Sequence, residues 1–162
     1  MSGILNWMVK VVDEVLARSA FDRAIKDQRP EFGAFFLAQL LALDISYSDD
    51  TCTIRFPVQD FLFNPQGSLH GGIIGTIMDI SMGHLIHHIY GRSGATIEMK
   101  VQYLRPLTTG SAVCTGQFIK RGKSIAFLES RLADSSDSLV AHATSTWKCS
   151  APTQTASTHS QV

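Results

Sequence analysis

The chain has 162 residues, 44% of them hydrophobic, which fits one domain with its own hydrophobic core. Charged residues make up only 17%, below the roughly 25% that is usual for soluble proteins, so we expect part of the surface to be buried between subunits. The formal net charge is zero, and a neutral chain lacks the basic surface that binds nucleic acid or an anionic membrane.

The first part of the chain predicts a helical extension, residues 1–42. Residues 4–27 repeat apolar side chains at helical spacing, Pro30 ends or redirects that helix, and residues 32–41 predict a second, short helix. Charged residues interrupt the apolar start, so no signal peptide is expected, and no run reaches the roughly 18 apolar residues of a membrane span.

The rest of the chain predicts an α+β domain, residues 43–149. Short strands at 43–47 and 51–58 precede an apolar helix from Ser68 to Tyr90. After this helix the apolar period becomes two, and short turns indicate antiparallel neighbours. We therefore expect a long helix wrapped by an antiparallel sheet, followed by a disordered tail, residues 150–162. The later strands are predicted at 96–104, 111–120, 124–133 and 139–148.

The apolar helix contains one carboxylate, Asp79. Burying an unpaired carboxylate costs about several kcal/mol, so such a residue is rarely kept for packing alone. At about 100° per residue, Asp79 shares a face with Gly72, Gly75, Thr76 and Gly83. This face has almost no side chains, so a substrate or another backbone can approach the carboxylate closely. The pattern predicts a functional site.

The entry to this helix contains a second signal. Gly71 and Gly72 open the helix without a Cβ, and free N–H groups at a helix start stabilise negative charge. A tight turn between packed backbones would also explain His-Gly-Gly by itself. The functional interpretation is favoured because Asp79 follows two turns later and Asn64 precedes His70 by six residues.

Three motifs in this sequence resemble a known family. The run N-x-x-G-x-x-H-G-G, with an aspartate seven residues later, is followed by T-x-E-x-K-V-x-Y-L-R-P and K-R-G-K. Together, over about residues 43–148, they resemble the hotdog-fold acyl-CoA thioesterases of the phenylacetate-degradation (PaaI-like) type. The resemblance implies homodimers that join their sheets edge to edge, active sites at the dimer interface, and pairing of dimers into homotetramers. It implies no metal and no cofactor beyond the coenzyme A of the substrate.

The resemblance also implies catalytic roles for individual residues. Asp79 would activate water as a general base or attack the thioester itself, and the N–H of Gly71 would stabilise the oxyanion. Asn64 would orient the carbonyl or the water, and Thr96 would help to hold that water. Asn64 and Gly71 of one subunit would meet Asp79 and Thr96 of the other. His70 is expected to hold the loop and set the angle of Gly71, with catalysis as the alternative.

Substrate-binding residues are also predicted. The basic turn Arg121-Gly122-Lys123 suits the phosphates of coenzyme A, although an ordinary solvated turn is the alternative; Arg105 is a weaker candidate. Gly72 lies on the Asp79 face, and Met82 is expected to border the acyl pocket. His84 and His88 have a zinc-binding spacing but lack an obvious third ligand, so packing or a place in the pocket is expected instead. The remaining pocket candidates are Phe61, Phe63, Leu69 and Ile86.

The predicted function is hydrolysis of an acyl- or aryl-CoA to the free acid and coenzyme A. A hydratase or dehydratase of the same fold is an alternative, but Leu62 stands where it needs an acid, two residues before Asn64. A non-catalytic acyl-CoA sensor is another alternative, although residues 1–42 contain neither a basic cluster nor a helix-turn-helix pattern. An acyl-carrier-protein thioester could replace the CoA substrate. Three widely spaced cysteines without a C-x-x-C pair favour a cytoplasmic location.

Overall fold

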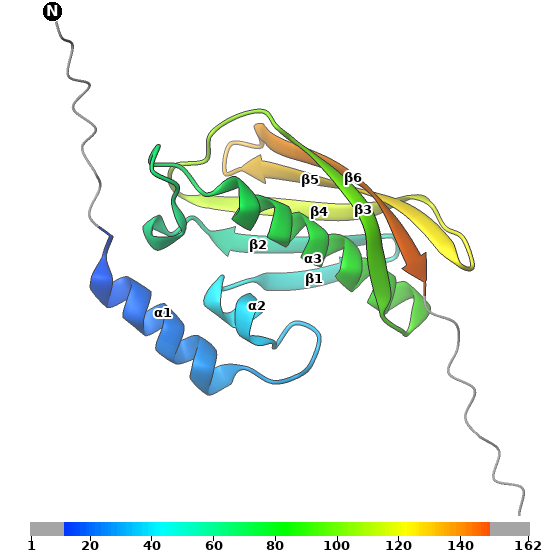
Figure 1. Ribbon diagram of the computed structural model, residues 1–162, viewed down its shortest axis with the longest axis horizontal. Coiled ribbons are helices and arrows are strands. Elements are labelled where there is room, and N and C mark those ends of the chain that lie inside the picture. Colours follow the sequence, from blue (N-terminus) through cyan, green and yellow to red (C-terminus); the bar gives the residue numbers. More distant parts are fainter. Residues whose placement is uncertain (1–11, 150–162) are drawn as a thin grey trace, which may run out of the picture.

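One antiparallel sheet of six strands curves around the helix α3 in the computed structural model, which describes residues 12–149 (Figure 1). The strand order is β1-β2-β4-β5-β6-β3, so β1 and β3 form the two edges of this sheet. The helices and strands are α1 (Glu14–Asp27), α2 (Phe36–Leu40), β1 (Asp44–Ser48), β2 (Thr51–Pro57), the 3-10 helix η1 (Asp60–Leu62), α3 (Gly71–Tyr90), β3 (Gly94–Tyr103), β4 (Ser111–Lys120), β5 (Ile125–Asp134) and β6 (Leu139–Cys149).

All six predicted strands are confirmed, with small shifts at their ends. The central helix is also confirmed, and it begins at Gly71, as the glycine pair predicts, rather than at the approximate bound of Ser68. The reason lies in the backbone before it: Leu69 forms an antiparallel bridge with Phe63 and donates its N–H to the carbonyl of Leu107 at 2.8 Å. That extended residue cannot also belong to the helix.

Within the described residues, the two N-terminal helices begin at Glu14 and Phe36. Asp13 caps α1 by accepting the N–H of Leu16 at 3.0 Å, and the part of the predicted helix before residue 12 lies outside the described residues. The second helix begins at Phe36 rather than at residue 32, because Gly33 has a positive φ of 83° and forms a turn. The predicted disordered tail, residues 150–162, also lies outside the described residues.

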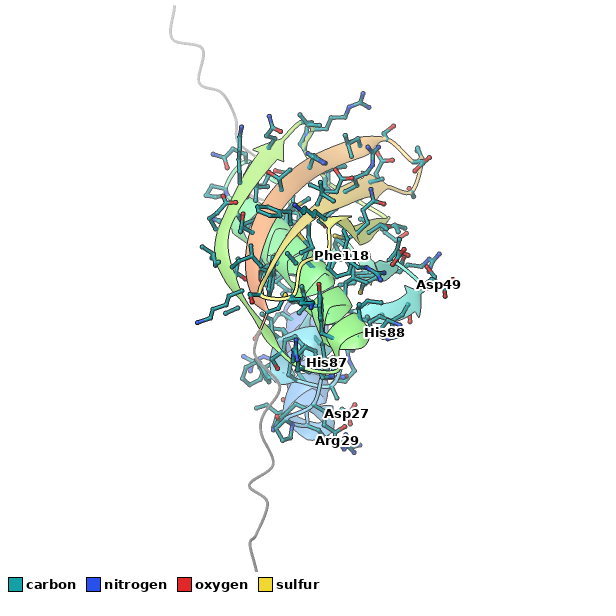
Figure 2. All side chains as sticks on the ribbon, turned by 90° about the vertical axis from the view of Figure 1, so that its right-hand side faces the viewer. Asp27, Arg29, Asp49, His87, His88 and Phe118 are labelled. Atoms are coloured by element: carbon teal, nitrogen blue, oxygen red, sulfur yellow. The ribbon has the colours of Figure 1, made fainter. Side chains whose placement is uncertain are left out.

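The core lies between α3 and the concave face of the sheet. Viewed from its end, α3 occupies the trough of the curved sheet, with His87 and His88 near its last turn (Figure 2). Fully burying each large apolar side chain here contributes about 1.5–3 kcal/mol. The largest fully buried side chains include Ile77, Met78, Met82, Leu85 and Ile86 of α3 and Ile54, Leu128 and Leu132 of the sheet.

The edge strand β3 presents apolar residues to solvent in this chain. Ile97, Tyr103 and the adjoining Leu104 are all more than half exposed, at 56%, 53% and 53%. An edge strand also carries backbone N–H and C=O groups that can pair with another strand.

No helix within residues 12–149 is long and apolar enough to cross a membrane.

Candidate active site

Asp79 lies on the face of α3 that is turned toward β3. The hydroxyl of Thr96 donates a hydrogen bond to Oδ1 of Asp79 at 2.8 Å, so these two residues meet within one chain. A β-bulge in β3 makes this contact possible. Thr96 pairs with Trp147, yet Glu98 pairs with Thr146, which leaves Ile97 as the extra residue. Thr96 and Glu98 therefore face opposite sides of the sheet, and Thr96 points to α3.

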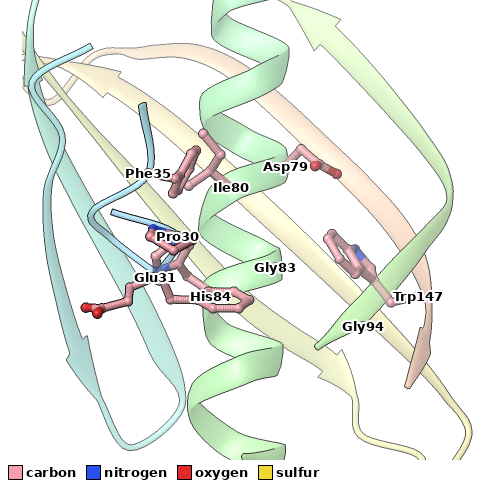
Figure 3. A pocket seen from close by; sticks show the side chains of 10 residues that line it. Pro30, Glu31, Phe35, Asp79, Ile80, Gly83, His84, Gly94 and Trp147 are labelled. Atoms are coloured by element: carbon pink, nitrogen blue, oxygen red, sulfur yellow. The ribbon is translucent and has the colours of Figure 1, made fainter. Parts of the chain in front are cut away.

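A cavity of about 380 Å³ adjoins Asp79. The close view shows the Asp79 carboxylate and the Trp147 ring on one side of α3, and Phe35, Ile80 and His84 on the other (Figure 3). A Cβ at Gly83 would lie 3.0 Å from Cη2 of Trp147, so glycine here lets the Trp147 ring pack directly against the helix. The remaining lining residues are Pro30, Glu31, Phe32, Gly83 and Gly94.

His84 is a neutral wall of this cavity. Its Nδ1 forms a 2.7 Å hydrogen bond with the hydroxyl of Tyr47. Burial, and secondly the nearby His87, lower the pKa of His84 to about 4, so the imidazole carries no charge at neutral pH. Nε2 of His84 and Nε1 of Trp147 are both buried and have no hydrogen-bond partner among the described residues.

The other histidines of α3 are occupied in aromatic packing. The ring of His87 stacks on Phe32 with centroids 3.8 Å apart, and that of His88 stacks on Tyr47 at 4.5 Å. Within residues 12–149, no three His, Cys, Asp or Glu side chains come close enough together to hold a metal ion.

The loop before α3 builds a second, separate cavity of about 310 Å³. Oδ1 of Asn64 accepts the backbone N–H groups of Gln66 and Ser68 at 3.0 and 3.3 Å, which closes the loop. The lining of this cavity includes Asn64, Gly71, Tyr103 and Arg105. Within one chain, Asn64 and Gly71 therefore line one cavity and Asp79 lines the other.

His70 sets the hydrogen bonding at the start of α3. It is the N-cap residue, and its Nδ1 accepts the N–H of Gly72 at 2.9 Å. The N–H of Gly72 is thus engaged, whereas that of Gly71, the first helical residue, has no acceptor inside the helix. The hydroxyl of Tyr103 donates to the carbonyl of Gly71 at 2.8 Å, which fixes this turn against β3.

The two basic side chains of the turn after β4 make contacts on different surfaces. Arg121 forms an ion pair with Asp50 and packs over the ring of Phe118 at 5.0 Å. Lys123 instead lines a third cavity, of about 620 Å³, together with Arg92 and Lys148. A Cβ at Gly122 would clash with the carbonyl of Ile125 at 2.0 Å, so the turn between the two basic residues requires glycine.

Several predicted pocket residues lie elsewhere. Met82 and Ile86 are fully buried in the core, because they are on the sheet side of α3, and Leu69 lines the 310 Å³ cavity rather than the one beside Asp79. Sequence reasoning missed Phe32, Phe35 and Trp147, and it missed Arg92 and Lys148 as neighbours of Lys123. One available signal was the alternation of β6, which places Trp147 on the same face as Ala143 and Ser145.

Comparison with known proteins gives consistent matches. Residues 66–141 match the family model described as the Thioesterase superfamily. Acyl-coenzyme A thioesterase 13 of Mus musculus is 31% identical over 85 residues, which are 51% of this chain and 61% of that protein. The chain therefore matches about three fifths of the length of this relative.

Solved structures share the same arrangement of helix and sheet. A conserved protein of Pseudomonas aeruginosa is 28% identical, with a TM-score of 0.65 over 69% of this chain and 91% of its own. The PaaI protein from the phenylacetic acid degradation operon of E. coli is 20% identical, with a TM-score of 0.65 over 68% of this chain and 86% of its own.

Proposed function

We propose that this chain, a hotdog-fold member of the thioesterase superfamily, hydrolyses an acyl- or aryl-CoA thioester to the free acid and coenzyme A. One observation carries the proposal: the Asp79 carboxylate, held by the Thr96 hydroxyl at 2.8 Å, borders a cavity with mostly apolar walls. A thioester carbonyl is already electrophilic, so its hydrolysis needs a placed base or nucleophile and a donor for the oxyanion.

In the proposed reaction, Asp79 takes a proton from water as the water oxygen attacks the thioester carbon. Thr96 donates to Oδ1, which leaves Oδ2 to receive that proton. The tetrahedral intermediate then collapses, the C–S bond breaks, and coenzyme A leaves as the thiol after it takes up the proton that Asp79 received. Direct attack of the carboxylate on the carbonyl carbon is the alternative. The C–S bond then breaks, coenzyme A leaves as the thiolate, and water hydrolyses the resulting anhydride.

The oxyanion donor would come from a second copy of the chain. Gly71 and Asn64 line a different cavity from Asp79 in one chain. In a two-fold symmetric dimer the same surface of both copies meets, and a residue of one copy contacts a different residue of the other. The edge strand β3, with its exposed Ile97 and Tyr103, is the surface we assign to this dimer. Further pairing of dimers into a tetramer is consistent with the low share of charged residues.

The nucleotide end of coenzyme A is assigned to a basic cavity. Lys123, Arg92 and Lys148 line the same 620 Å³ space, and their combined positive charge suits phosphate groups. Arg121 is engaged by Asp50, so Lys123 is the stronger candidate within the predicted turn. An acyl-carrier-protein thioester, whose phosphopantetheine carries one phosphate, remains the second candidate substrate.

The decisive experiment replaces Asp79. We expect Asp79→Asn to lower kcat by about 100-fold or more, because the amide can neither take a proton from water nor attack the carbonyl. The assay is thiol release from phenylacetyl-CoA and octanoyl-CoA. Circular dichroism and the urea midpoint of unfolding serve as controls that the variant folds. Turnover close to that of the wild type would contradict the proposed mechanism.

A further inference from the structure

The cavity beside Asp79 has one wall that does not belong to the sheet or to α3. This wall is the turn at residues 30–35 between α1 and α2, which we call the wall segment. Four of its residues, Pro30, Glu31, Phe32 and Phe35, line the cavity. The wall segment lies outside residues 66–141, which match the family model, so it is a feature that the superfamily match does not account for.

The wall segment is held against α3 by its aromatic side chains. Phe32 stacks on His87 with centroids 3.8 Å apart and meets the edge of His84 at 5.1 Å. Phe35 lies 6.2 Å from the His84 ring, centroid to centroid. The backbone of the segment closes on itself, because Ala34 donates to the carbonyl of Glu31 at 3.1 Å. The two phenylalanines therefore have defined positions.

The walls of the cavity favour a ring over an unbranched chain. Phe35 and His84 lie on one side of α3 and Trp147 on the other (Figure 3). Aromatic side chains make favourable edge-to-face and offset contacts with another ring, and an alkyl chain cannot make them. An apolar cavity of about 150 Å³ is enough to bind benzene, so the 380 Å³ here accommodates a ring and its linker to the thioester.

We propose that the wall segment, through Phe32 and Phe35, determines the acyl specificity of this chain by favouring acyl groups that carry an aromatic ring. The proposal rests on the proposed hydrolysis at Asp79. It makes two residues of the N-terminal part of the chain specificity determinants, although neither lies on the elements that carry the catalytic groups.

The test compares kcat/KM for phenylacetyl-CoA and octanoyl-CoA in wild type, Phe32→Ala and Phe35→Ala. We expect each variant to lower the ratio of phenylacetyl-CoA to octanoyl-CoA about tenfold or more, a range typical of changes in the packing of a substrate group in an apolar pocket. Phe36→Ala is the matched control. Phe36 belongs to the adjoining α2 and packs edge-to-face on Phe21 at 5.7 Å, so the ratio should stay unchanged. A ratio unchanged in both wall variants, or lowered equally in the control, overturns the proposal.

A binding measurement separates this proposal from the proposed hydrolysis. Trp7→Phe leaves Trp147 as the sole tryptophan of the chain, and its fluorescence reports occupancy of the cavity. We expect phenylacetate to change this fluorescence, and Phe35→Leu to weaken the apparent affinity several-fold while Phe36→Leu does not. If no thioester is hydrolysed but these binding results hold, the proposed hydrolysis fails and the wall assignment stands. If phenylacetate leaves the fluorescence unchanged, the wall assignment is wrong.

Discussion

At the scale of single residues, two neighbouring N–H groups at the start of α3 differ in whether they already have a hydrogen-bond acceptor. The imidazole of His70 accepts the N–H of Gly72, so of the two glycines it is Gly71 that keeps an N–H available for a ligand. The Tyr103 hydroxyl holds the carbonyl of the same residue. His70 therefore caps the turn that carries the proposed oxyanion donor, and its role in orienting Gly71 for catalysis stays a prediction.

This arrangement allows the N–H of Gly71 to be removed without a change of fold. Proline is well tolerated at the first position of a helix, and His70 already has the extended backbone, with ψ of 132°, that a following proline requires. We expect Gly71→Pro to lower kcat about 100-fold, the usual loss for one oxyanion donor. Gly71→Ala adds the same Cβ beside the Tyr103 ring but keeps the N–H.

Thiol-release kinetics on both variants check this prediction. Gly71→Ala should stay within about tenfold of the wild type, because it perturbs only the packing against Tyr103. Equal losses in the alanine and proline variants would assign the effect to crowding and would remove Gly71 from the proposed mechanism. The urea midpoints of the two variants show whether both retain the fold.

At the scale of elements, α3 crosses the sheet where β4 carries Gly116. A Cβ at this position would lie 2.9 Å from Oγ and 3.0 Å from the carbonyl carbon of Ser81. The helix therefore packs closely on the strand here, and the hydroxyl of Ser81 is satisfied by Ser130 at 2.9 Å. This contact sets how closely α3 approaches the sheet. The approach of α3 in turn affects the distance from Asp79 to Thr96.

We expect Gly116→Ala to lower the free energy of unfolding by about 1–3 kcal/mol, the usual cost of overpacking. Urea denaturation of the variant measures this change. Ser81→Ala in the same chain removes only Oγ, whereas the backbone atoms of Ser81 also crowd the new methyl group. The double variant should therefore remain destabilised. Full recovery in the double variant would show that only the hydroxyl limits the approach of α3.

The sequence predicts helices and strands well where the spacing of apolar residues is regular. It predicts their ends poorly where a long-range backbone hydrogen bond replaces the local one. The period-two strands and the apolar α3 are confirmed. The start of α3 at Gly71 agrees with the prediction that Gly71 and Gly72 open the helix. The approximate bound at Ser68 is too early, because Leu69 bonds to Leu107 across a distance that no local pattern reveals. The pairing of Asp79 with Thr96 was implied by the resemblance, but the bulge at Ile97 that directs Thr96 leaves no signal in a single sequence. The sequence pattern predicts that Phe32 and Phe35 belong to a helix. Nothing in the local sequence indicates that these two side chains contact α3 instead.

At the scale of the whole molecule, the proposed site is divided between two surfaces of one chain. Asp79 and Gly71 belong to one helix but line different cavities. A helix rises about 1.5 Å per residue, so about eight residues place these two groups roughly 12 Å apart, too far to contact the same carbonyl. The proposed reaction thus requires a second copy of the chain, and subunit exchange can test this directly.

We expect a mixture of two inactive variants, Asp79→Asn and Gly71→Pro, to recover activity after subunit exchange. In a mixed dimer, one site receives the intact Asp79 and the intact Gly71, and the other site receives both substitutions. Random pairing makes half of the dimers mixed, so about a quarter of the wild-type activity should return. As the control, each variant alone is taken through the same exchange procedure, and its activity should not recover. No recovery, with exchange verified by mass spectrometry, would mean that the catalytic groups act within one chain.

The wall segment has a consequence for the divergence of related proteins. Its backbone hydrogen bonds join Arg29 to Ala34 and Ala34 to Glu31, and none of these bonds extends into the sheet. Insertions and substitutions in such a turn disturb neither the strand register nor the core, so they are easily tolerated. Substrate preference can therefore change in evolution while Asp79, Thr96 and the packing of α3 stay the same. Two homologues that agree in every catalytic residue can act on different acyl groups, and comparison of their residues at 30–35 would reveal it.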